Sequence, residues 1–549
     1  MTITIETIDV RMEDLEHLVE RARRGALSEP EYETLKAVVH TLGHVAELLA
    51  MHGTTLADLR RLLLAQQGTT EKTRTVLARA GIAGDAEHAS PDSSERPARH
   101  DRRPGHGRHG ADAFTGGHRV VVAHRHLKAG DHCPGCLKGK IYGHQPPTRL
   151  VRFIGQAPIA ATVYELEKLR CNLCGEIFTA AAPPDVGPEK YDATAASMIA
   201  VLKYGAGVPF ARLAGLQQRV EIPLPEATQW EIVHEVATVI QPAFHELLRQ
   251  AAQGEVVYND DTSVPVLALR RERVDGRTGV FTSGIVSTID GRQIALYFTG
   301  PKHAGENLAT VLAHRAATLP PPIQMCDALA RNLPTFPPAF ETIVGYCLAH
   351  ARRRFVNVTP AFPTECRYVL ETLGAVYQVD AQARAQGLSP EARLQRHQAD
   401  SAPRLAELHV WLATQLDEHR IEPNSGLGQA ISYFLKHWDR LTLFLRVPGA
   451  PLDNNICERA LKKAILHRKN ALFFKTTTGA LVGDIYMSLI HTADLAGANA
   501  FDYLTALQRH AAELTQAPAA WMPWNYRETL AQVDASPSTA QRGSPVVIV

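Results

Sequence analysis

Residues 255–269 read EVVYNDDTSVPVLAL, and at this point the hydrophobic pattern of the chain changes from helical to strand-like. Two more strand-like stretches follow, GVFTSGIVSTID at 279–290 and QIALYFTG at 293–300. A helical stretch, AGENLATVLAHRAA at 304–317, then leads to a short strand within PIQMCDAL at 322–329. This order predicts three antiparallel strands, a helix and a returning strand.

The predicted element order is that of a ribonuclease-H-like core, in which acidic residues on the first and fourth strands become neighbours. Asp260 or Asp261 is the candidate on the first strand, and Asp327 is the candidate on the fourth. An aspartate inside an apolar strand is costly unless it is paired or bound to metal. Aspartates that only cap the segment after each strand are the alternative, which a third acid joining the pair would disfavour.

Glu458 is the candidate third acid. Residues 452–470, LDNNICERALKKAILHRKN, predict a helix that begins with Asp453 as its N-cap and runs through Lys463. Asn454 and Glu458 are four residues apart and share one helix face, so Glu458 can point into a site. The acid stands among basic residues that we expect to hold DNA phosphates: Arg459, Lys462, Lys463, Arg468 and Lys469.

Three converging carboxylates repel one another unless cations lie between them. Mg²⁺, or Mn²⁺ in its place, prefers oxygen ligands and is the expected ion at Asp260, Asp327 and Glu458. Two such ions about 3.5 to 4 Å apart can activate a water or a 3′-hydroxyl for in-line attack on phosphorus. The three acids therefore predict metal-assisted phosphoryl transfer on DNA.

The overall composition is typical of a soluble protein with several domains. The 549 residues suffice for about three or four domains; 45% of residues are apolar, 21% are charged, and the formal net charge is +1. No apolar run is long enough to span a membrane, and the N-terminal residues lack the apolar centre of a signal peptide. We expect a cytoplasmic protein with no membrane partner.

The N-terminal part predicts an oligomerisation segment followed by a linker. Residues 1–83 are expected to be helical and carry the heptad spacing of a coiled coil, with leucine at every seventh position: Leu35, Leu42, Leu49, Leu56 and Leu63. Packing against its own chain is the alternative to pairing of subunits. Residues 84–118 are rich in Ser, Pro, Gly, His and Arg, which predicts a disordered basic linker. It is either a solvated tether or a weak attractor of phosphate.

Residues 119–186 predict a zinc ribbon. They carry two Cys-x-x-Cys pairs whose four thiolates can converge on one tetrahedral Zn²⁺: Cys133, Cys136, Cys171 and Cys174. A redox motif would need only one pair. Because so small a module has little core, zinc should contribute much of its folding free energy.

Two other regions are predicted to be helical. Residues 187–252 contain helices separated by a short break, which suits either a DNA-reading helix-turn-helix or plain helical packing. The long segment between Asp327 and Glu458 has helical composition and predicts an all-α insertion at about 360–448. The predicted fold class is therefore a multidomain α+β protein.

Several stretches are similar to the successive motifs of one family: YNDDTSVPVL, QMCDAL, GYCLAHARRRFV, PLDNNICERALKKAILHRKNALFF, YMSLIHTADLAGANAFDYLTAL and the closing MPWN. Together with the heptads and the Cys-x-x-Cys ribbon, they follow the order of the insertion sequence 66 family of bacterial transposases. The resemblance covers roughly residues 30 to 527. It implies a DDE transposase whose ribonuclease-H-like catalytic domain occupies residues 253–510, followed by a C-terminal tail at 511–549.

The resemblance also implies the site residues. It carries the catalytic triad onto Asp260, Asp327 and Glu458. The family usually reads Asp-Glu-Thr where this chain has Asp260-Asp261-Thr262, and we choose Asp260 because Asp261 would face the opposite side of the strand.

The CLAH stretch resembles a Cys-x-x-His element that related transposase groups associate with handling DNA near the site. Its residues here are Cys347 and His350, and a helical pair with no contact is the alternative. A basic cluster lies beside it, with phosphate as the expected partner and a solvated helix face as the alternative: Arg352, Arg353 and Arg354.

The function implied by the resemblance is transposition. The protein would bind the ends of its own mobile element, cleave the DNA and join the freed 3′-hydroxyls to target DNA. Expected partners are double-stranded DNA, a second copy or more of the chain, and small accessory proteins of the same element, at the nucleoid of a bacterial cytoplasm. The alternatives are a catalytically silent repressor of the element and a ribonuclease-H-like nuclease without strand transfer.

Overall fold

The computed structural model describes residues 73–79, 121–124, 126–134, 156–170, 177–184, 189–270, 279–336 and 340–535, together with residues 21, 22, 28, 32, 35, 136, 138, 140, 141, 172, 186, 187 and 277. The predicted linker lies outside these residues, as do Cys171, Cys174 and nearly all of the predicted coiled coil. The predicted combination of helices with a mixed sheet is confirmed.

The chain divides into two compact units. The larger comprises Met1–Gly84, Ala200–Gly207 and His234–Val549, and the smaller comprises Asp85–Ile199 and Val208–Val233. None of the described helices is long and apolar enough to cross a membrane.

The larger unit contains a five-stranded sheet with the order β5-β4-β3-β6-β7. Its strands are β3 (Val256–Ser263), β4 (Phe281–Ile289), β5 (Arg292–Gly300), β6 (Ile323–Cys326) and β7 (Ile343–Tyr346). The first three are antiparallel neighbours, whereas β6 is parallel to both β3 and β7. Asp290 and Gly291 close the β4–β5 hairpin with φ of 48° and 75°, the backbone that a tight two-residue turn between twisted strands requires.

Helices α8 (Ala304–Leu312) and α15 (Asn455–Ala471) cover opposite faces of this sheet, and α16 (Thr477–Leu495) lies along β5. On the α8 face, the Asn307 amide donates to the Ser283 hydroxyl of β4 at 2.8 Å. On the α15 face, the Tyr297 hydroxyl of β5 donates to the Ala460 carbonyl at 2.7 Å. Gly284 follows Ser283 and pairs with Tyr297, so the two contacts lie on opposite faces.

Helix α16 closes the outer edge of β5. Three outward backbone amides of the strand donate to polar side chains of the helix: Ala295 to Thr492 at 3.1 Å, Tyr297 to Ser488 at 3.0 Å and Thr299 to Asp484 at 2.6 Å. An uncovered strand edge offers unpaired amides to other chains. These contacts explain why polar residues are buried in the middle of α16.

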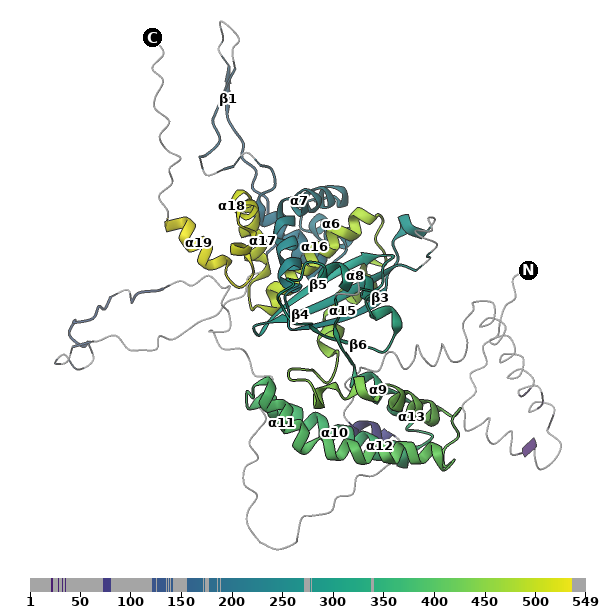
Figure 1. The fold of residues 1–549 in the computed structure, drawn as a ribbon. Helices are drawn as coiled ribbons and strands as arrows, with labels where there is room; N and C mark the ends of the chain where they lie inside the picture. Colours follow the sequence, from purple (N-terminus) through teal and green to yellow (C-terminus); the bar gives the residue numbers. More distant parts are fainter. Residues whose placement is uncertain are drawn as a thin grey trace, which may run out of the picture. The chain divides into compact units, whose positions relative to one another are not determined.

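Residues 348–445 form helices throughout, without a strand: α9 (Leu348–Val358), α10 (Pro363–Ala385), α11 (Pro390–Asp400), α12 (Ala402–Asp417), α13 (Gly426–Lys436), α14 (Trp438–Leu441) and the short η5 (Leu443–Leu445). Figure 1 shows the longer of these helices packed side by side, in green. Asp380 of α10 is 4% exposed and joins α10 to α11 through Arg393 at 2.7 Å and His397 at 3.2 Å.

Residues 511–535, which we expected to belong to a C-terminal tail, are largely helical. They form α18 (Ala511–Gln516), η6 (Pro518–Trp521) and α19 (Tyr526–Ala535), which follow α17 (Ala500–Arg509). Trp521 and Tyr526 are buried, and the Tyr503 hydroxyl of α17 donates to the Trp521 carbonyl at 3.1 Å. These aromatic side chains bury enough apolar surface to fold residues 511–535 onto α17.

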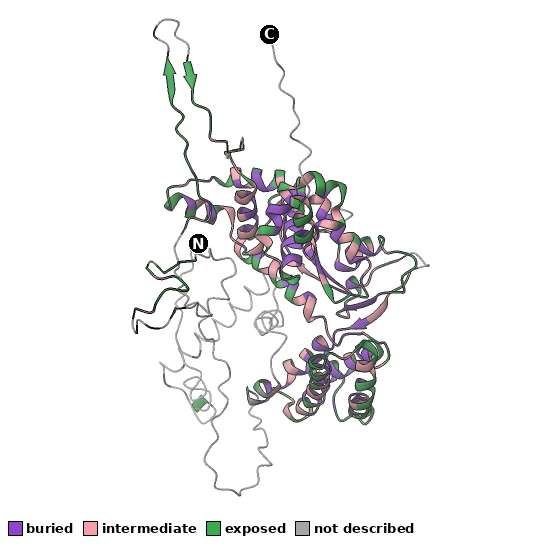
Figure 2. Cartoon of the chain, turned by 90° about the vertical axis from the view of Figure 1, so that its left-hand side faces the viewer, coloured by how far each residue is buried: buried purple, intermediate pink, exposed green. Residues whose placement is uncertain are grey.

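The smaller unit contains helices and an exposed two-stranded ribbon. Its elements include β1 (Lys168–Arg170), β2 (Ile177–Thr179), α5 (Ala193–Ala200) and α6 (Phe210–Arg219). The last residue of α5, Ala200, is assigned to the larger unit. The buried Gln217 amide donates to the Ile159 carbonyl at 2.8 Å and so ties α6 to the preceding segment. Figure 2 shows the contrast between the exposed β1 and β2 and the buried residues of the helices and the five-stranded sheet. α7 (Glu226–Ala251) crosses the boundary between the units.

Candidate active site

Strands β3 and β6 bring Asp260 and Asp327 together. Their parallel register pairs Tyr258 with Met325, and continuing it by two residues sets Asp260 beside Asp327. One side-chain nitrogen contacts both acids: Asn332 Nδ2 lies 3.3 Å from Asp260 Oδ1 and also donates to Asp327 Oδ1. The two carboxylates are therefore neighbours that share one hydrogen-bond donor.

Asp260 and Asp261 point to opposite faces of the sheet. Asp260 pairs with Gly284, which contacts Leu461 of α15, so it faces α15. The Asp261 side chain is 1% exposed and lies on the α8 face, 2.9 Å from His303 Nδ1 and 3.3 Å from an Arg331 guanidinium nitrogen. Asp261 is thus engaged in its own ion pairs and does not join Asp327.

The electrostatics of the pair favour a bound cation. Burial and, next to it, the neighbouring Asp327 carboxylate together raise the pKa of Asp260 to about 7. The hydrogen bonds from the Asp261 amide and Asn332 only partly oppose this shift. A positive charge beside these two acids would remove the repulsion that holds the proton on Asp260.

The start of α15 is held against the same strand ends. The Asn454 side-chain amide donates to the Asn259 carbonyl of β3 at 3.1 Å, and the Asn454 backbone amide donates to Cys347 Sγ at 3.2 Å. The Leu348 amide of α9 donates to the Leu452 carbonyl at 3.0 Å. These contacts place the first turn of α15, which carries Glu458, next to the ends of β3 and β7.

The predicted N-cap was wrong by one residue. Helix α15 begins at Asn455, so Asn454 occupies the cap position, and the helix continues past Lys463 to Ala471. Asp453 still supports the helix start, because its Oδ1 accepts from the Asn455 amide at 3.1 Å. The Asn454 side chain makes no cap hydrogen bond, and its amide nitrogen instead donates to the Asn259 carbonyl of β3.

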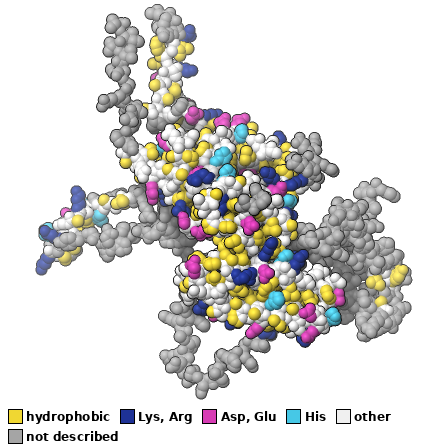
Figure 3. Space-filling model, viewed as in Figure 1, with side chains coloured by type: hydrophobic (Ala, Val, Ile, Leu, Met, Phe, Trp, Pro, Cys, Tyr) yellow, Lys and Arg dark blue, Asp and Glu magenta, His cyan; other side chains and the backbone are white. Residues whose placement is uncertain are grey.

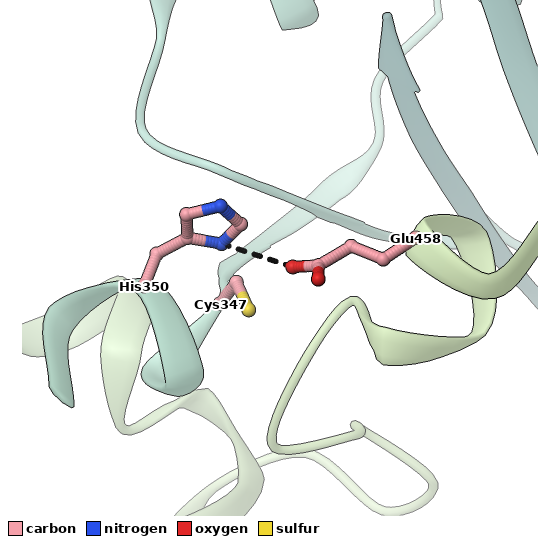
Figure 4. Close-up of side chains that lie close together, drawn as sticks. All are labelled: Cys347, His350 and Glu458. Atoms are coloured by element: carbon pink, nitrogen blue, oxygen red, sulfur yellow. Dashed lines mark ion pairs between the residues drawn. The ribbon is translucent and has the colours of Figure 1, made fainter. Parts of the chain in front are cut away.

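Glu458 faces His350 and Cys347 (Figure 4). His350 Nδ1 lies 3.6 Å from Glu458 Oε1, and the ligand atoms of all three residues lie within 4.8 Å of one another. Burial lowers the pKa of His350, while Glu458 and, more weakly, Asp327 act to raise it, so both acids are near the imidazole. Glu458 Oε1 is buried and has no hydrogen-bond partner among the described residues.

The basic residues of α15 divide into anchored and exposed ones. Arg468 donates to Thr262 Oγ1 at 3.1 Å and to the Ser263 carbonyl, which fixes the helix to the end of β3. Lys463 lies 3.4 Å from Asp494 of α16. The exposed ones are Arg459, Lys462 and Lys469. On the face shown in Figure 3, basic side chains are scattered among acidic and hydrophobic ones.

Two residues that we expected to contact DNA are buried. Cys347 is 1% exposed, and its sulfur accepts from the Asn454 amide. Arg352 is 9% exposed and donates to Thr73 Oγ1 at 3.2 Å. Neither side chain offers a surface to phosphate. Arg353 is half-buried, and Arg354 is exposed with its guanidinium 3.8 Å from the centroid of the Tyr433 ring.

Asn332 and Tyr433 are residues of this region that the sequence did not reveal. Asn332 ends the short η4 helix (Ala330–Asn332) five residues after Asp327, and no motif marks it. Tyr433 belongs to α13 of the helical region, and burial raises its pKa to about 12, with nearby Arg354 opposing the shift and Asp327 adding to it. The only sequence signal for Tyr433 was its position among aromatic residues of a segment with the composition of a helical core.

Gly305 of α8 controls the position of Asn332. A Cβ at Gly305 would lie 2.4 Å from the Leu333 carbonyl oxygen and 2.8 Å from the Arg331 carbonyl oxygen. Gly305→Ala must therefore displace η4, and we expect a loss of about 1 to 3 kcal/mol in the free energy of unfolding, measured by thermal or urea unfolding. Gly300→Ala is the matched control, since nothing lies within 4 Å of its Cβ. Equal stability of the two variants would contradict this packing.

Comparison with known sequences agrees with the resemblance noted from the motifs. The model of the family described as "Transposase IS66 family" matches residues 190–481, which include Asp260, Asp327 and Glu458. The chain belongs to the IS66 transposase family. The matched region also contains the five-stranded sheet, the helices between β7 and α15, and the Cys347–His350 pair.

Relatives of this chain occur in Sinorhizobium fredii (strain NBRC 101917 / NGR234). "Uncharacterized protein y4jD" is 28% identical over 357 residues, which cover 60% of this chain and 65% of that protein. "Uncharacterized protein y4hP" is 25% identical over 356 residues, which cover 60% of this chain and 61% of that protein. The chain thus spans less than two thirds of the length of these curated relatives.

Proposed function

We propose that this chain binds the ends of a bacterial insertion sequence, cleaves the DNA and transfers the 3′-hydroxyl ends to target DNA. The observation that carries the proposal is the meeting of Asp260 with Asp327 beside the helix start that presents Glu458. The strand order, with three antiparallel strands, a helix and parallel strands on the other side of β3, supports assignment of the sheet to the ribonuclease-H-like class.

The donor set fits a hard divalent cation. Asp260 and Asp327 supply neighbouring carboxylates, and Glu458 adds a buried oxygen with no other partner among the described residues. Carboxylate oxygens are the ligands that Mg²⁺ and Mn²⁺ prefer. When bound, such ions would polarise the attacking oxygen and stabilise the leaving oxygen of a phosphodiester.

The remaining side chains orient the acids and the substrate. Asn332 holds Asp260 and Asp327 at one spacing through its single amide nitrogen. Exposed cations on α15, the helix that carries Glu458, and on α9 are available for DNA phosphates. Such contacts would position the DNA strand without reading its sequence. These cations are Arg459, Lys462 and Lys469 on α15 and Arg354 on α9, which follows the half-buried Arg353.

We assign the zinc ribbon and the helices after it to recognition of the element ends. Cys133 and Cys136 lie in a turn that an isolated antiparallel bridge, His132 with Lys140, closes. The second Cys-x-x-Cys pair falls between the antiparallel β1 and β2. The four thiolates of two Cys-x-x-Cys pairs are a typical ligand set for structural Zn²⁺. The heptads would pair subunits, and accessory proteins of the element remain expected partners.

Separate replacement of Asp260 and of Asp261 by asparagine tests this function. The assay follows cleavage and joining of DNA that carries both element ends, with Mg²⁺, next to DNA binding by mobility shift. Asp260→Asn should bind DNA but neither cleave nor join, whereas Asp261→Asn should still cleave because its carboxylate faces α8. Cleavage without joining by the native chain would indicate a nuclease, and binding without cleavage would indicate a repressor.

Metal binding should depend on pH through Asp260. Its pKa is raised to about 7 by burial and by Asp327, so below that pH a proton competes with the cation. We expect the affinity for Mg²⁺ to rise by about tenfold per pH unit up to about pH 7 and to level off above it. Thermal-shift titrations with Mg²⁺ on both sides of pH 7 measure this, and Asp260→Asn should flatten the dependence. A native affinity that does not change with pH would contradict it.

A further inference from the structure

A second set of metal-binding atoms lies on one side of the three acids. Cys347 Sγ, a His350 ring nitrogen and a Glu458 carboxylate oxygen all lie within 4.8 Å of one another. Figure 4 shows the His350 and Glu458 side chains pointing toward each other, with the Cys347 sulfur close by. Sulfur, nitrogen and oxygen together are donors for zinc-like ions, whereas Mg²⁺ takes oxygen alone.

The sulfur of Cys347 sits where a metal thiolate is stabilised. The Asn454 backbone amide donates to the Cys347 sulfur at 3.2 Å. The backbone amides of Asn454 and His350 both favour negative charge on this sulfur. Cys347 is also the N-cap residue of α9, whose dipole favours negative charge at that end. A metal ion bound to this sulfur would displace the thiol proton to solvent.

The other two ligands lack a partner that would satisfy them. His350 Nδ1 and Glu458 Oε1 are both buried and without a hydrogen bond among the described residues, and their separation of 3.6 Å is too long for one. A cation bound to both atoms would satisfy them together. The Cys-x-x-His spacing across the first turn of α9 also suits two ligands of one ion.

We propose that Cys347, His350 and Glu458 form a site for one zinc-class transition-metal ion, with a remaining position open to water. This site is distinct from the predicted zinc ribbon and from the Mg²⁺ ligands Asp260 and Asp327. Because it includes Glu458, a zinc-class ion there would withdraw the third acid from the catalytic set and inhibit the enzyme. That consequence for activity rests on the proposed function, while the binding site itself does not.

Cobalt spectroscopy on the full chain tests the binding site without DNA. Co²⁺ bound by a thiolate gives a sulfur-to-metal charge-transfer band. Cys133→Ser/Cys136→Ser disables the ribbon, and in that background the band should persist with about one equivalent of Co²⁺. Adding Cys347→Ser should abolish the band, and adding His350→Ala should weaken binding roughly tenfold or more. Adding Cys366→Ser, which removes a buried cysteine of α10, should change neither.

The band's response decides the proposal. The proposal is overturned if the charge-transfer band survives Cys347→Ser. It is also overturned if the ribbon-disabled chain shows no band while circular dichroism shows native helix content. Glu458→Gln provides a variant that leaves the Cys-x-x-His turn intact in case Cys347→Ser misfolds, and it should also weaken Co²⁺ binding.

Inhibition is a separate measurement. In the presence of Mg²⁺, low Zn²⁺ should reduce DNA cleavage by the native chain and much less by His350→Ala. Co²⁺ binding without Zn²⁺ inhibition would overturn the regulatory consequence, and a native chain with a normal Co²⁺ band but no cleavage at all would count against the proposed function instead.

Discussion

Glu458→Gln is expected to reduce DNA cleavage by roughly a thousandfold or more while leaving DNA binding unchanged. The substitution keeps the shape of the side chain but removes the charge that a divalent ion needs from its third carboxylate. Glu458 Oε1 has no other partner among the described residues, so the loss should fall on metal binding and not on folding. Gel assays of cleavage and mobility-shift assays on the same DNA measure the two effects.

Glu513→Gln is the matched control for this variant. Glu513 stands in the first turn of α18, as Glu458 does in α15, but it is exposed. The Glu513→Gln variant should cleave DNA like the native chain. Retained cleavage by Glu458→Gln would remove the helix acid from the mechanism and leave Asp260 and Asp327 as an incomplete pair.

Asp380→Asn is expected to destabilise the helical region between β7 and α15 by about 3 to 5 kcal/mol. Asp380 is buried and lies 2.8 Å from Arg384, 2.7 Å from Arg393 and 3.2 Å from His397. Burial alone would raise its pKa, but the His397 hydrogen bond and the arginine charges hold it below the ordinary value. Neutralising Asp380 leaves those cations without their shared counter-charge.

Thermal unfolding of the native chain and the variant measures this loss. Since the folded-state pKa of Asp380 is lowered, its stabilisation is complete above the ordinary Asp pKa and is lost as the pH falls through the folded value. Asp400→Asn removes the partner of Arg396 in an exposed pair and should cost about 1 kcal/mol or less. Equal melting temperatures for the two variants would contradict a structural role for Asp380.

The consequence of that loss should extend to the candidate site. Tyr377 and Arg384 of α10 both lie near enough to Asp453, just before α15, to lower the pKa of its carboxyl against the effect of burial. Loosening α10 would therefore loosen the start of the helix that carries Glu458. The helical region thus has a positional role that its sequence composition did not reveal.

Four of the five strands, β3 to β6, could be predicted from the sequence because their signals are local, whereas β7 was not predicted. Alternating apolar residues around 255–300, the Asp290–Gly291 turn and the helical period after 304 each determine an element without help from distant residues. The choice of Asp260 over Asp261 rested on the same kind of argument, and the structure does place the two on opposite faces.

Other expectations failed because they depended on which distant residues meet. The residues after 510 read as a tail, but Trp521 and Tyr526 find a buried surface on α17. We expected Cys347 and Arg352 to contact DNA near the site, but both are buried, with Cys347 against the Asn454 amide and Arg352 against Thr73. Arg468 read as a phosphate contact, but it anchors α15 to the end of β3.

The sequence by itself determined the element order, the acidic residues at the strand ends and the family motifs, because strand and helix periods and turn residues act over a few positions. The tertiary structure decided that Asn332 joins Asp260 to Asp327, that Asp261 is held by His303 and Arg331, and that Cys347 and His350 meet Glu458. These contacts join residues far apart along the chain, and only the packing of helices on the sheet brings their side chains within hydrogen-bond or metal-ligand distance.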